Sequence, residues 1–351
     1  MKYYKFSVAF AIFAVVLGYV LWGPAAALII AVLGVLETSL SFDNAVVNAR
    51  VLEHWDHKWR QRFLMWGILV AVFGMRIIFP VAIVSVATGI GPFAVTNMAL
   101  NDPAAYAAHL KSVHHEVAGF GGAFLFMVAF GYFFEEKQVY WWEAIERRLT
   151  KFGQLEGVAG AVTLAMMAVI SKLFSDPAHG TEFLLAGVWG VVTFIIAHGI
   201  GTVLGSGDED GDDADESNPL APAVIKAGIA GFLYLEILDA SFSFDGVIGA
   251  FVLSNYLPII ALGLGVGAFF VRSMTIHLVE AGTLAEYRYL EHGAFYAILA
   301  LATIMFASGL GYELPEWATG LMSAGLIASA VLHSIVVNRR EAATNSTTVT
   351  A

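Results

Sequence analysis

The chain has 351 residues, of which 58% are hydrophobic and only 13% are charged, and its formal net charge is −11. Because soluble proteins carry roughly 25% charged residues, this composition excludes an ordinary soluble domain and indicates a protein embedded in a bilayer. The absence of cysteine excludes disulfides and thiolate metal sites, and no basic cluster indicates nucleic-acid binding.

Hydropathy predicts an all-α polytopic membrane protein, with apolar segments close to the roughly 20 residues that a bilayer helix needs. The first segment follows Lys2 and Lys5 without a cleavage site, so we expect a retained signal anchor. Residues 90–116 are expected to form a loop with a short interfacial helix. About ten transmembrane helices are predicted, at 5–22, 24–50, 63–89, 116–134, 154–173, 182–204, 221–253, 257–281, 293–311 and 317–337.

The chain is expected to fold as two halves joined by an acidic linker. The predicted divisions are an N-terminal half (1–205) whose spans 24–89 form repeat 1, a linker (206–219), a C-terminal half (220–337) whose spans 221–281 form repeat 2, and a disordered tail (338–351). The linker includes SGDEDGDDADESN, a run of acids and glycines that is typical of disorder.

The basic residues predict the orientation. With the N-terminus in the cytoplasm, 14 of the 18 lysines and arginines fall in cytoplasmic segments, Lys111 and Lys172 fall in outer ones, and two lie within spans. This distribution follows the positive-inside rule. We therefore expect a multi-pass protein of the inner (plasma) membrane with both termini in the cytoplasm.

An eight-residue pattern occurs twice inside apolar segments, as ETSLSFDN at 37–44 and DASFSFDG at 239–246. Glu37 matches Asp239 and Asp43 matches Asp245. An ionised carboxylate in hydrocarbon is unfavourable by roughly 2.5–3.5 kcal/mol even on the gentlest scales. Four acids at matched positions therefore predict a cation site built by two halves of one protein.

The similarity continues after each motif, as GILVAVFGMR at 67–76 and GLGVGAFFVR at 263–272. The copies are offset by five predicted spans. Because this number is odd, the second copy should lie upside down relative to the first. Inverted repeats are common in secondary transporters, where the substrate binds between the copies.

Helical geometry limits how the acids can meet. Glu37 and Asp43 are six residues apart, about 120° off a common face, so one straight helix cannot bring both to one small ion. Either the helices break near Asn44 and Gly246, or the inverted helices cross and share a site. Serines four residues from an acid, such as Ser41 after Glu37 and Ser39 before Asp43, should share its face.

Hard oxygen ligands suit manganese, calcium and magnesium. The predicted metal ligands are Glu37, Asp43, Asn44, Asp239 and Asp245, and the supporting residues are Ser39, Ser41, Ser241, Ser243 and Glu236. The cation is expected as substrate, with no prosthetic group.

Arg76 and Arg272 are the basic residues within the predicted spans. Since a guanidinium repels a cation, we interpret them as counter-ions or gating residues. The alternative is that they pair with the acids for structure alone, although two arginines leave these acids in excess. His54 with His57, and His114 with His115, are expected in loops, and neither pair alone indicates a metal site.

The pattern LETSLSFDN, followed by Arg60, Arg62 and GILVAVFGMRI, resembles the TerC family of integral membrane proteins, which is related to the LysE-type exporters. Glu37, Asp43 and Asn44 match its first motif, Glu236, Asp239 and Asp245 match its second, and an arginine follows each. Gly246 stands where the family usually has serine. The resemblance covers roughly residues 30–80 and 225–280, and it implies manganese efflux or tellurium resistance.

We therefore expect a transporter that exports a divalent metal cation, with manganese first and calcium or magnesium possible. The alternative is a non-transporting membrane factor that aids protein assembly or tellurium-type stress resistance. An enzyme is not expected, because the sequence contains no convincing nucleophile–base pair and no HExxH motif.

Overall fold

The computed structural model describes residues 2–67, 70–155, 157–204, 228–254, 256–312 and 314–349, and every regular element in these ranges is a helix. The predicted all-α fold is therefore confirmed. The acidic linker lies outside the described residues.

In chain order the elements are α1 (Lys5–Trp22), α2 (Pro24–Leu40), α3 (Phe42–Glu53), α4 (His57–Arg62), η1 (Phe63–Gly67), η2 (Val70–Ile78), α5 (Phe79–Thr88), α6 (Pro92–Asn101), α7 (Pro103–Ser112), α8 (His114–Phe134), α9 (Glu143–Gly153), α10 (Val158–Ile170), η3 (Ser171–Leu173), α11 (Pro177–Leu204), α12 (Ile229–Leu253), α13 (Leu257–Glu280), α14 (Thr283–Glu286), α15 (Leu290–Gly309) and α16 (Glu316–Val349).

Several of these helices are long and apolar enough to cross a bilayer, as expected for a multi-pass membrane protein. Within the described ranges six helices qualify, or up to eight if each of two bent pairs counts as one span. The pairs are α2 with α3, bent by 51°, and α9 with α10, bent by 103°. Helix α12, with three acids in its sequence, is not among the eight.

The predicted span 63–89 is not one α-helix. It consists of the π-helices η1 and η2 followed by α5, which begins at Phe79. Pro80 near the start of α5 has no backbone N–H and cannot continue the preceding hydrogen-bond ladder. Wide π turns often occur at functional sites, and here they carry Arg76.

Three other segments differ from expectation. Residues 90–116 contain two helices, α6 and α7, and not one short helix in a loop. His114 and His115 begin α8 and do not lie in a loop. Helix α16 continues to Val349, so residues 338–349 are helical in the structure and not a disordered tail.

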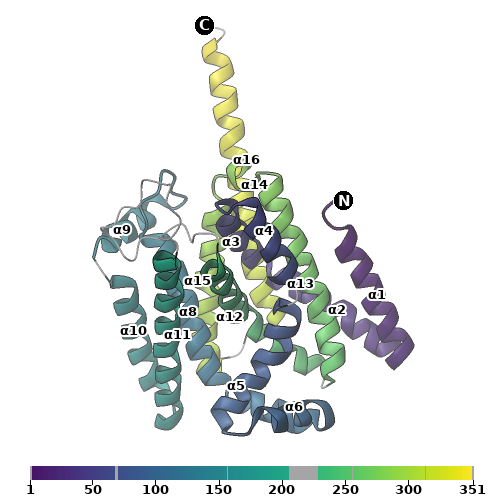
Figure 1. The fold of residues 1–351 in the computed structure, drawn as a ribbon. Coiled ribbons are helices and arrows are strands. Elements are labelled where there is room, and N and C mark those ends of the chain that lie inside the picture. Colours follow the sequence, from purple (N-terminus) through teal and green to yellow (C-terminus); the bar gives the residue numbers. More distant parts are fainter. Residues whose placement is uncertain are drawn as a thin grey trace.

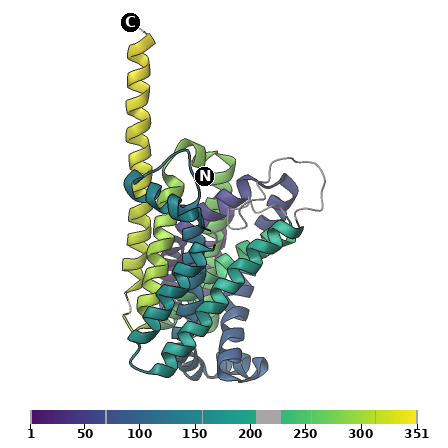
Figure 2. The ribbon, with the colours of Figure 1, turned by 90° about the vertical axis from the view of Figure 1, so that its left-hand side faces the viewer.

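The helices form a bundle with two recognisable ends (Figure 1). One end carries α4, α9 and α14 and is called the α9 end; the other carries α5 and α6 and is called the α6 end. The last part of α16 projects beyond the bundle at the α9 end, as Figure 2 shows from a second direction. Eight of the described basic residues lie on segments of the α9 end, whereas Lys111 is on α7 and Lys172 is on η3. The eight are Lys58, Arg60, Arg62, Lys137, Arg147, Arg148, Lys151 and Arg288.

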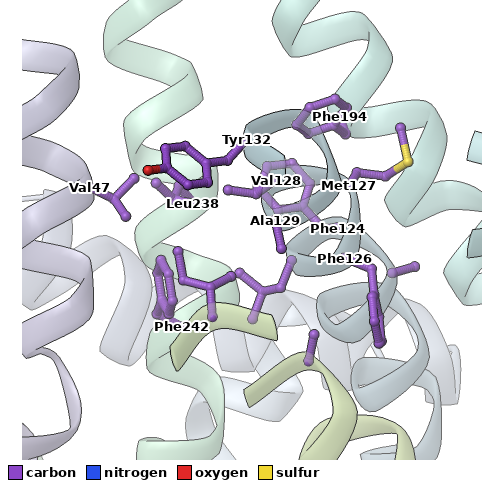
Figure 3. Packing of buried hydrophobic residues seen from close by; sticks show 14 of the residues in the cluster. Val47, Phe124, Phe126, Met127, Val128, Ala129, Tyr132, Phe194, Leu238 and Phe242 are labelled. Carbon is purple, nitrogen blue, oxygen red and sulfur yellow. The ribbon is translucent and has the colours of Figure 1, made fainter. Parts of the chain in front are cut away.

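The largest buried cluster surrounds α8. Phe124, Met127 and Val128 of this helix pack with Phe194 of α11 and Leu238 of α12 (Figure 3). Helices α8 and α11 approach closely because glycines face the opposite backbone: a Cβ at Gly119 would overlap the Phe183 carbonyl, and one at Gly190 would overlap the Phe120 carbonyl. Small residues allow the same close packing in other membrane helices.

Glycines also bring α2 against α13. A Cβ on Gly34 would lie 2.8 Å from Val266 Cγ1, and a Cβ on Gly263 would lie 2.6 Å from Leu33 Cβ. The first helix of the predicted repeat 1 therefore packs on the second helix of the predicted repeat 2. The reciprocal pair, α12 and η2, is also in contact.

Candidate functional site

The first acidic motif lies at a break between two helices. Helix α2 ends at Leu40, Ser41 has a non-helical backbone (φ −97°, ψ 19°), and α3 begins at Phe42. The predicted break is thus present, three residues before Asn44. Helix α12 continues unbroken through Gly246, so the break expected there was wrong.

Arg76 joins the two motifs. Its guanidinium forms an ion pair with the Glu37 carboxylate, and its Nη1 lies 3.9 Å from Asp239 Oδ2. Asn44 Nδ2 donates a hydrogen bond of 2.5 Å to Asp239 Oδ1, and Ser41 Oγ donates one of 3.3 Å to Glu37 Oε1. All five residues are buried. We call Glu37, Asn44, Arg76 and Asp239 the Arg76 cluster.

Glycines make room for the acidic side chains. A Cβ on Gly246 of α12 would lie 2.8 Å from Glu37 Oε2, and a Cβ on Gly267 of α13 would overlap Glu37 Cγ. On η1, a Cβ on Gly67 would lie 3.0 Å from Glu236 Oε1. Each carboxyl is therefore held against bare backbone of another segment, which restricts its rotamers.

Two cavities reach the Arg76 cluster. The first, called the small cavity, has a volume of about 40 Å³ and is lined by Asn48, Phe63, Leu64, Gly67, Arg76, Glu236, Asp239, Ala268, Val271, Arg272 and Thr275. The second, called the large cavity, has a volume of about 520 Å³ and is lined by Leu36, Glu37, Leu40, Ser41, His114, Phe242, Gly246, Gly249, Leu253, Leu301, Ile304, Ser308, Leu314, Pro315, Trp317, Thr319 and Ser323.

The cavities lie toward opposite ends of the bundle. The large cavity includes Leu253, the last residue of α12, and His114, the first of α8, and so extends toward the α6 end. The small cavity includes Phe63, directly after α4, and extends toward the α9 end. Asn48 shares a cavity with Glu236, whereas Glu37 shares one with Gly246, so the α2–α3 segment and α12 run in opposite directions.

Several buried oxygens near the cluster accept no hydrogen bond from the described part of the chain. They are Asp43 Oδ2, Asn44 Oδ1, Asn48 Oδ1 and Glu236 Oε2. The other Asp43 oxygen accepts a hydrogen bond of 2.9 Å from the Asn44 backbone N–H. Buried acceptors without donors are unusual in native proteins, so these oxygens are free to bind a cation or water.

The other predicted site residues divide between the site and its surroundings. Ser39 is exposed and donates to the Val35 carbonyl of its own helix, and Ser241 donates likewise to Ile237. The expected Glu37–Ser41 contact is present, but the break at Ser41 separates Ser39 from Asp43. The side chains of Ser243 and Asp245 lie outside the described part of the structure. Arg272 donates through Nε to the Leu64 carbonyl of η1.

The carboxylates of the Arg76 cluster do not converge on one point as the ligands of a metal ion would. In the described part of the chain, the one group of three metal-ligating side chains with ligand atoms within 4.8 Å of each other lies elsewhere, at His115, His179 and Glu182. Around Arg76, one guanidinium faces the carboxyls of Glu37 and Asp239, and Glu236 lines the same cavity. The acids therefore remain in excess.

Sequence reasoning missed the glycines and Asn48. Gly67 and Gly267 lie in the two matched segments GILVAVFGMR and GLGVGAFFVR, so the sequence shows that a glycine follows each acidic motif. The sequence does not show that Gly67 contacts Glu236 and that Gly267 contacts Glu37, because each contact joins segments far apart in the chain.

Buried acids and an arginine between two cavities of an apolar helical bundle define a multi-pass membrane protein with a polar site inside it. A family model described as "Protein of unknown function (DUF475)" matches residues 42–341. The chain belongs to this family. No curated protein and no solved structure matches it.

Proposed function

We propose that this protein is a membrane transporter that exports a divalent metal cation, with manganese as the first candidate, through the Arg76 cluster. The observation that carries the proposal is the set of buried, donor-free oxygens beside carboxyls that meet two cavities. Carboxylate and amide oxygens are the ligands preferred by manganese, calcium and magnesium. Asp43, Asn44, Asp239 and Glu37 are the proposed ligands, with Asp245 from the second motif.

The packing supports an inverted repeat. The α2–α3 segment and α12 run in opposite directions. In each predicted repeat the first segment packs on the second segment of the other repeat, α2 on α13 and α12 on η2. An interface of this kind places the site between the halves, where transporters with inverted repeats bind their substrates. The ten-span topology is part of this proposal.

The Glu37–Arg76 ion pair acts as the gate. Glu37 lines the large cavity and Arg76 lines the small one, so their contact lies where the two cavities meet. A cation that binds Glu37 and Asp239 competes with the guanidinium for the same oxygens. Binding therefore releases Arg76 from Glu37, and the ion pair forms again when the cation leaves. While the ion pair is formed, it separates the large cavity from the small one.

The basic residues support one orientation of the protein in the membrane. The α9 end carries the described lysines and arginines of α4, α9 and the segments next to α8 and α14. The positive-inside rule supports a cytoplasmic α9 end, and with it both termini in the cytoplasm and the large cavity on the outer side. The resemblance to the TerC family supports export of a divalent cation, with manganese as the substrate.

The alternative is a membrane factor that does not transport. It is compatible with the ion pair between Glu37 and Arg76, because a purely structural pair would have the same geometry. The two functions differ in what the amide of Asn44 should do. A transporter needs the donor-free Asn44 Oδ1 as an ion ligand. A structural factor needs only the hydrogen bond from Asn44 Nδ2 to Asp239.

The experiment is Mn²⁺ flux through purified protein in liposomes. We expect Asp43→Asn and Asp239→Asn to abolish flux, and Ser41→Ala to lower it about 10–100-fold, the range for residues that orient a ligand. Ser39→Ala is the matched control, since Ser39 is exposed on the same helix and bonds only its own backbone. Unchanged flux in both aspartate variants, with the proteins folded, would overturn the proposal.

A further inference from the structure

A group of metal-ligating side chains lies outside the Arg76 cluster, at the α6 end of the bundle. His115 is in the first turn of α8, and His179 and Glu182 are in the first turns of α11. One ligand atom from each lies within 4.8 Å of those from the other two. Two imidazole nitrogens and one carboxylate oxygen are a set that binds zinc with its remaining position open to water.

The contacts within the group are specific. His115 Nε2 lies 2.8 Å from Glu182 Oε2, in hydrogen-bond contact. The rings of His115 and His179 are 4.4 Å apart between centroids. His179 and Glu182 are three residues apart on α11 and so point from one face of the helix. The ligands thus come from two helices that are distant in the chain.

A second shell of polar groups surrounds these ligands. Asp176 Oδ1 accepts a hydrogen bond of 2.9 Å from the Ala178 backbone N–H, and its Oδ2 lies 3.9 Å from His179 Nδ1. This separation is longer than a hydrogen bond, so Asp176 places negative charge beside the His179 ring. Glu116, next to His115, interacts electrostatically with all three ligands.

The backbones that carry the ligands are held tightly. Gly119, one turn after His115, faces the Phe183 carbonyl next to Glu182 so closely that a Cβ would overlap it. Gly180, next to His179, faces the Ser171 carbonyl in the same way. The first contact holds the start of α8 against α11 and the second holds the start of α11 against η3, so the backbones that carry the three ligands are positioned before any ion arrives.

The distances fit a small ion with modest adjustment. A tetrahedral zinc holds each ligand at about 2.0–2.1 Å, which places ligand atoms about 3.3 Å apart. The 2.8 Å contact between His115 and Glu182 must therefore open by about 0.5 Å, whereas the other ligand atoms, which lie within 4.8 Å of one another, must close by up to about 1.5 Å. His179 and Glu182 are about half exposed, so their side chains can make this adjustment. The ion takes the place of the proton shared between the imidazole and the carboxylate.

We propose that His115, His179 and Glu182 bind a divalent transition-metal ion of the zinc class and thereby join α8 to α11 at the α6 end. The site is separate from the Arg76 cluster and does not rest on the transport proposal. Its ligands are two nitrogens and one oxygen, whereas the Arg76 cluster offers oxygen alone.

The test is Zn²⁺ binding to the purified full-length protein, measured by competition with a chromophoric chelator. We expect His179→Ala and Glu182→Gln each to weaken one bound equivalent at least about tenfold. His109→Ala, which removes a histidine of α7, is the matched control and should leave that equivalent unchanged. Glu37→Gln should also leave it unchanged, which separates this site from the Arg76 cluster.

A second readout uses stability. If the ion joins two helices, saturating Zn²⁺ should raise the thermal unfolding midpoint of the unaltered protein and not that of His179→Ala. Because His179 is exposed, this substitution should not prevent folding. Equal Zn²⁺ affinity in the unaltered protein and in both ligand variants would overturn the proposal, and so would equal stabilisation of the unaltered protein and His179→Ala.

Discussion

The guanidinium of Arg76 is ion-paired with the carboxylate of Glu37, and both side chains are only 2% exposed. The pair joins the π-helix η2 to the end of α2, one turn before the break at Ser41. The pairing is not symmetric. Arg272, which matches Arg76 in the second repeat, donates to a backbone carbonyl of η1, while Asp239 lies 3.9 Å from Arg76.

Removing one partner of this buried pair should be more harmful than removing both. Glu37→Gln and Arg76→Gln should each lower the free energy of unfolding by about 3–5 kcal/mol, because each leaves a buried charge without its partner. The double variant should recover a large part of that loss. Denaturant unfolding in detergent across the full cycle measures the coupling, and strictly additive losses would contradict the buried pair.

Gly267 should not tolerate a side chain, because a Cβ there would overlap Glu37 Cγ and its own helix would have to move from α2. We expect Gly267→Ala to destabilise the protein by about 1–3 kcal/mol, the usual effect of overpacking. Gly265→Ala is the control on the same helix, since its Cβ would lie 3.6 Å from Val72 Cγ1, an ordinary contact. Thermal unfolding of the two variants should separate them; equal midpoints would show that α13 adapts.

Much of the helical architecture followed from hydropathy alone. The limits 5–22 and 257–281 agree with α1 and α13 within one residue, because these segments are long, mostly apolar and flanked by polar or turn residues. The six-residue spacing of Glu37 and Asp43 left two alternatives, a broken helix or crossing helices, and the structure has a break between α2 and α3. The position of the break at Ser41 did not follow from the sequence, since no proline or glycine marks it.

Other features depend on contacts that a single segment does not reveal. The π turns around Arg76 occur in a segment whose hydropathy is that of an ordinary span. The site at His115, His179 and Glu182 combines residues about 65 positions apart, and neither part is distinctive alone. Ser39 and Ser41 look alike in the motif, yet only Ser41 contacts an acid.

Glu146 should be a strong determinant of stability at the α9 end. Its buried carboxylate accepts hydrogen bonds from the backbone N–H groups of Trp141 and Trp142 and from the Tyr296 hydroxyl, and it lies 3.3 Å from His292 Nε2. Glu146→Ala leaves several buried donors unsatisfied, at about 1–3 kcal/mol for each.

The matched control for Glu146 is Glu143→Ala on the same helix. Glu143 forms an exposed ion pair with Arg147, and such pairs contribute roughly 0–1 kcal/mol. Chemical unfolding of both variants should therefore show a large loss for Glu146→Ala and a small one for Glu143→Ala. Similar losses of stability would mean that the hydrogen bonds of Glu146 do not stabilise the start of α9.

Lys137, between α8 and α9, should make stability depend on pH. Burial lowers its pKa from 10.5 to about 8, although Glu135 acts in the opposite direction, and the ammonium lies 4.2 Å from the centre of the Tyr132 ring. Below pH 8 the amine is protonated in both states, so the unfavourable burial of its charge is present in full. Between about pH 8 and 10.5 the unfolded chain binds a proton that the folded one does not, and this group's contribution to stability rises with pH.

The variant Lys137→Gln isolates this effect from other titrating groups. At pH 7 it should be more stable than the unaltered protein, because it removes a partly buried charge, and the difference should shrink as the pH rises toward 10. Lys151→Gln, at an exposed position of α9, should show no such trend. Thermal unfolding midpoints between pH 7 and 10 measure it. A constant difference would mean that Lys137 keeps its proton in the folded protein, with the Tyr132 ring and Glu135 outweighing its burial.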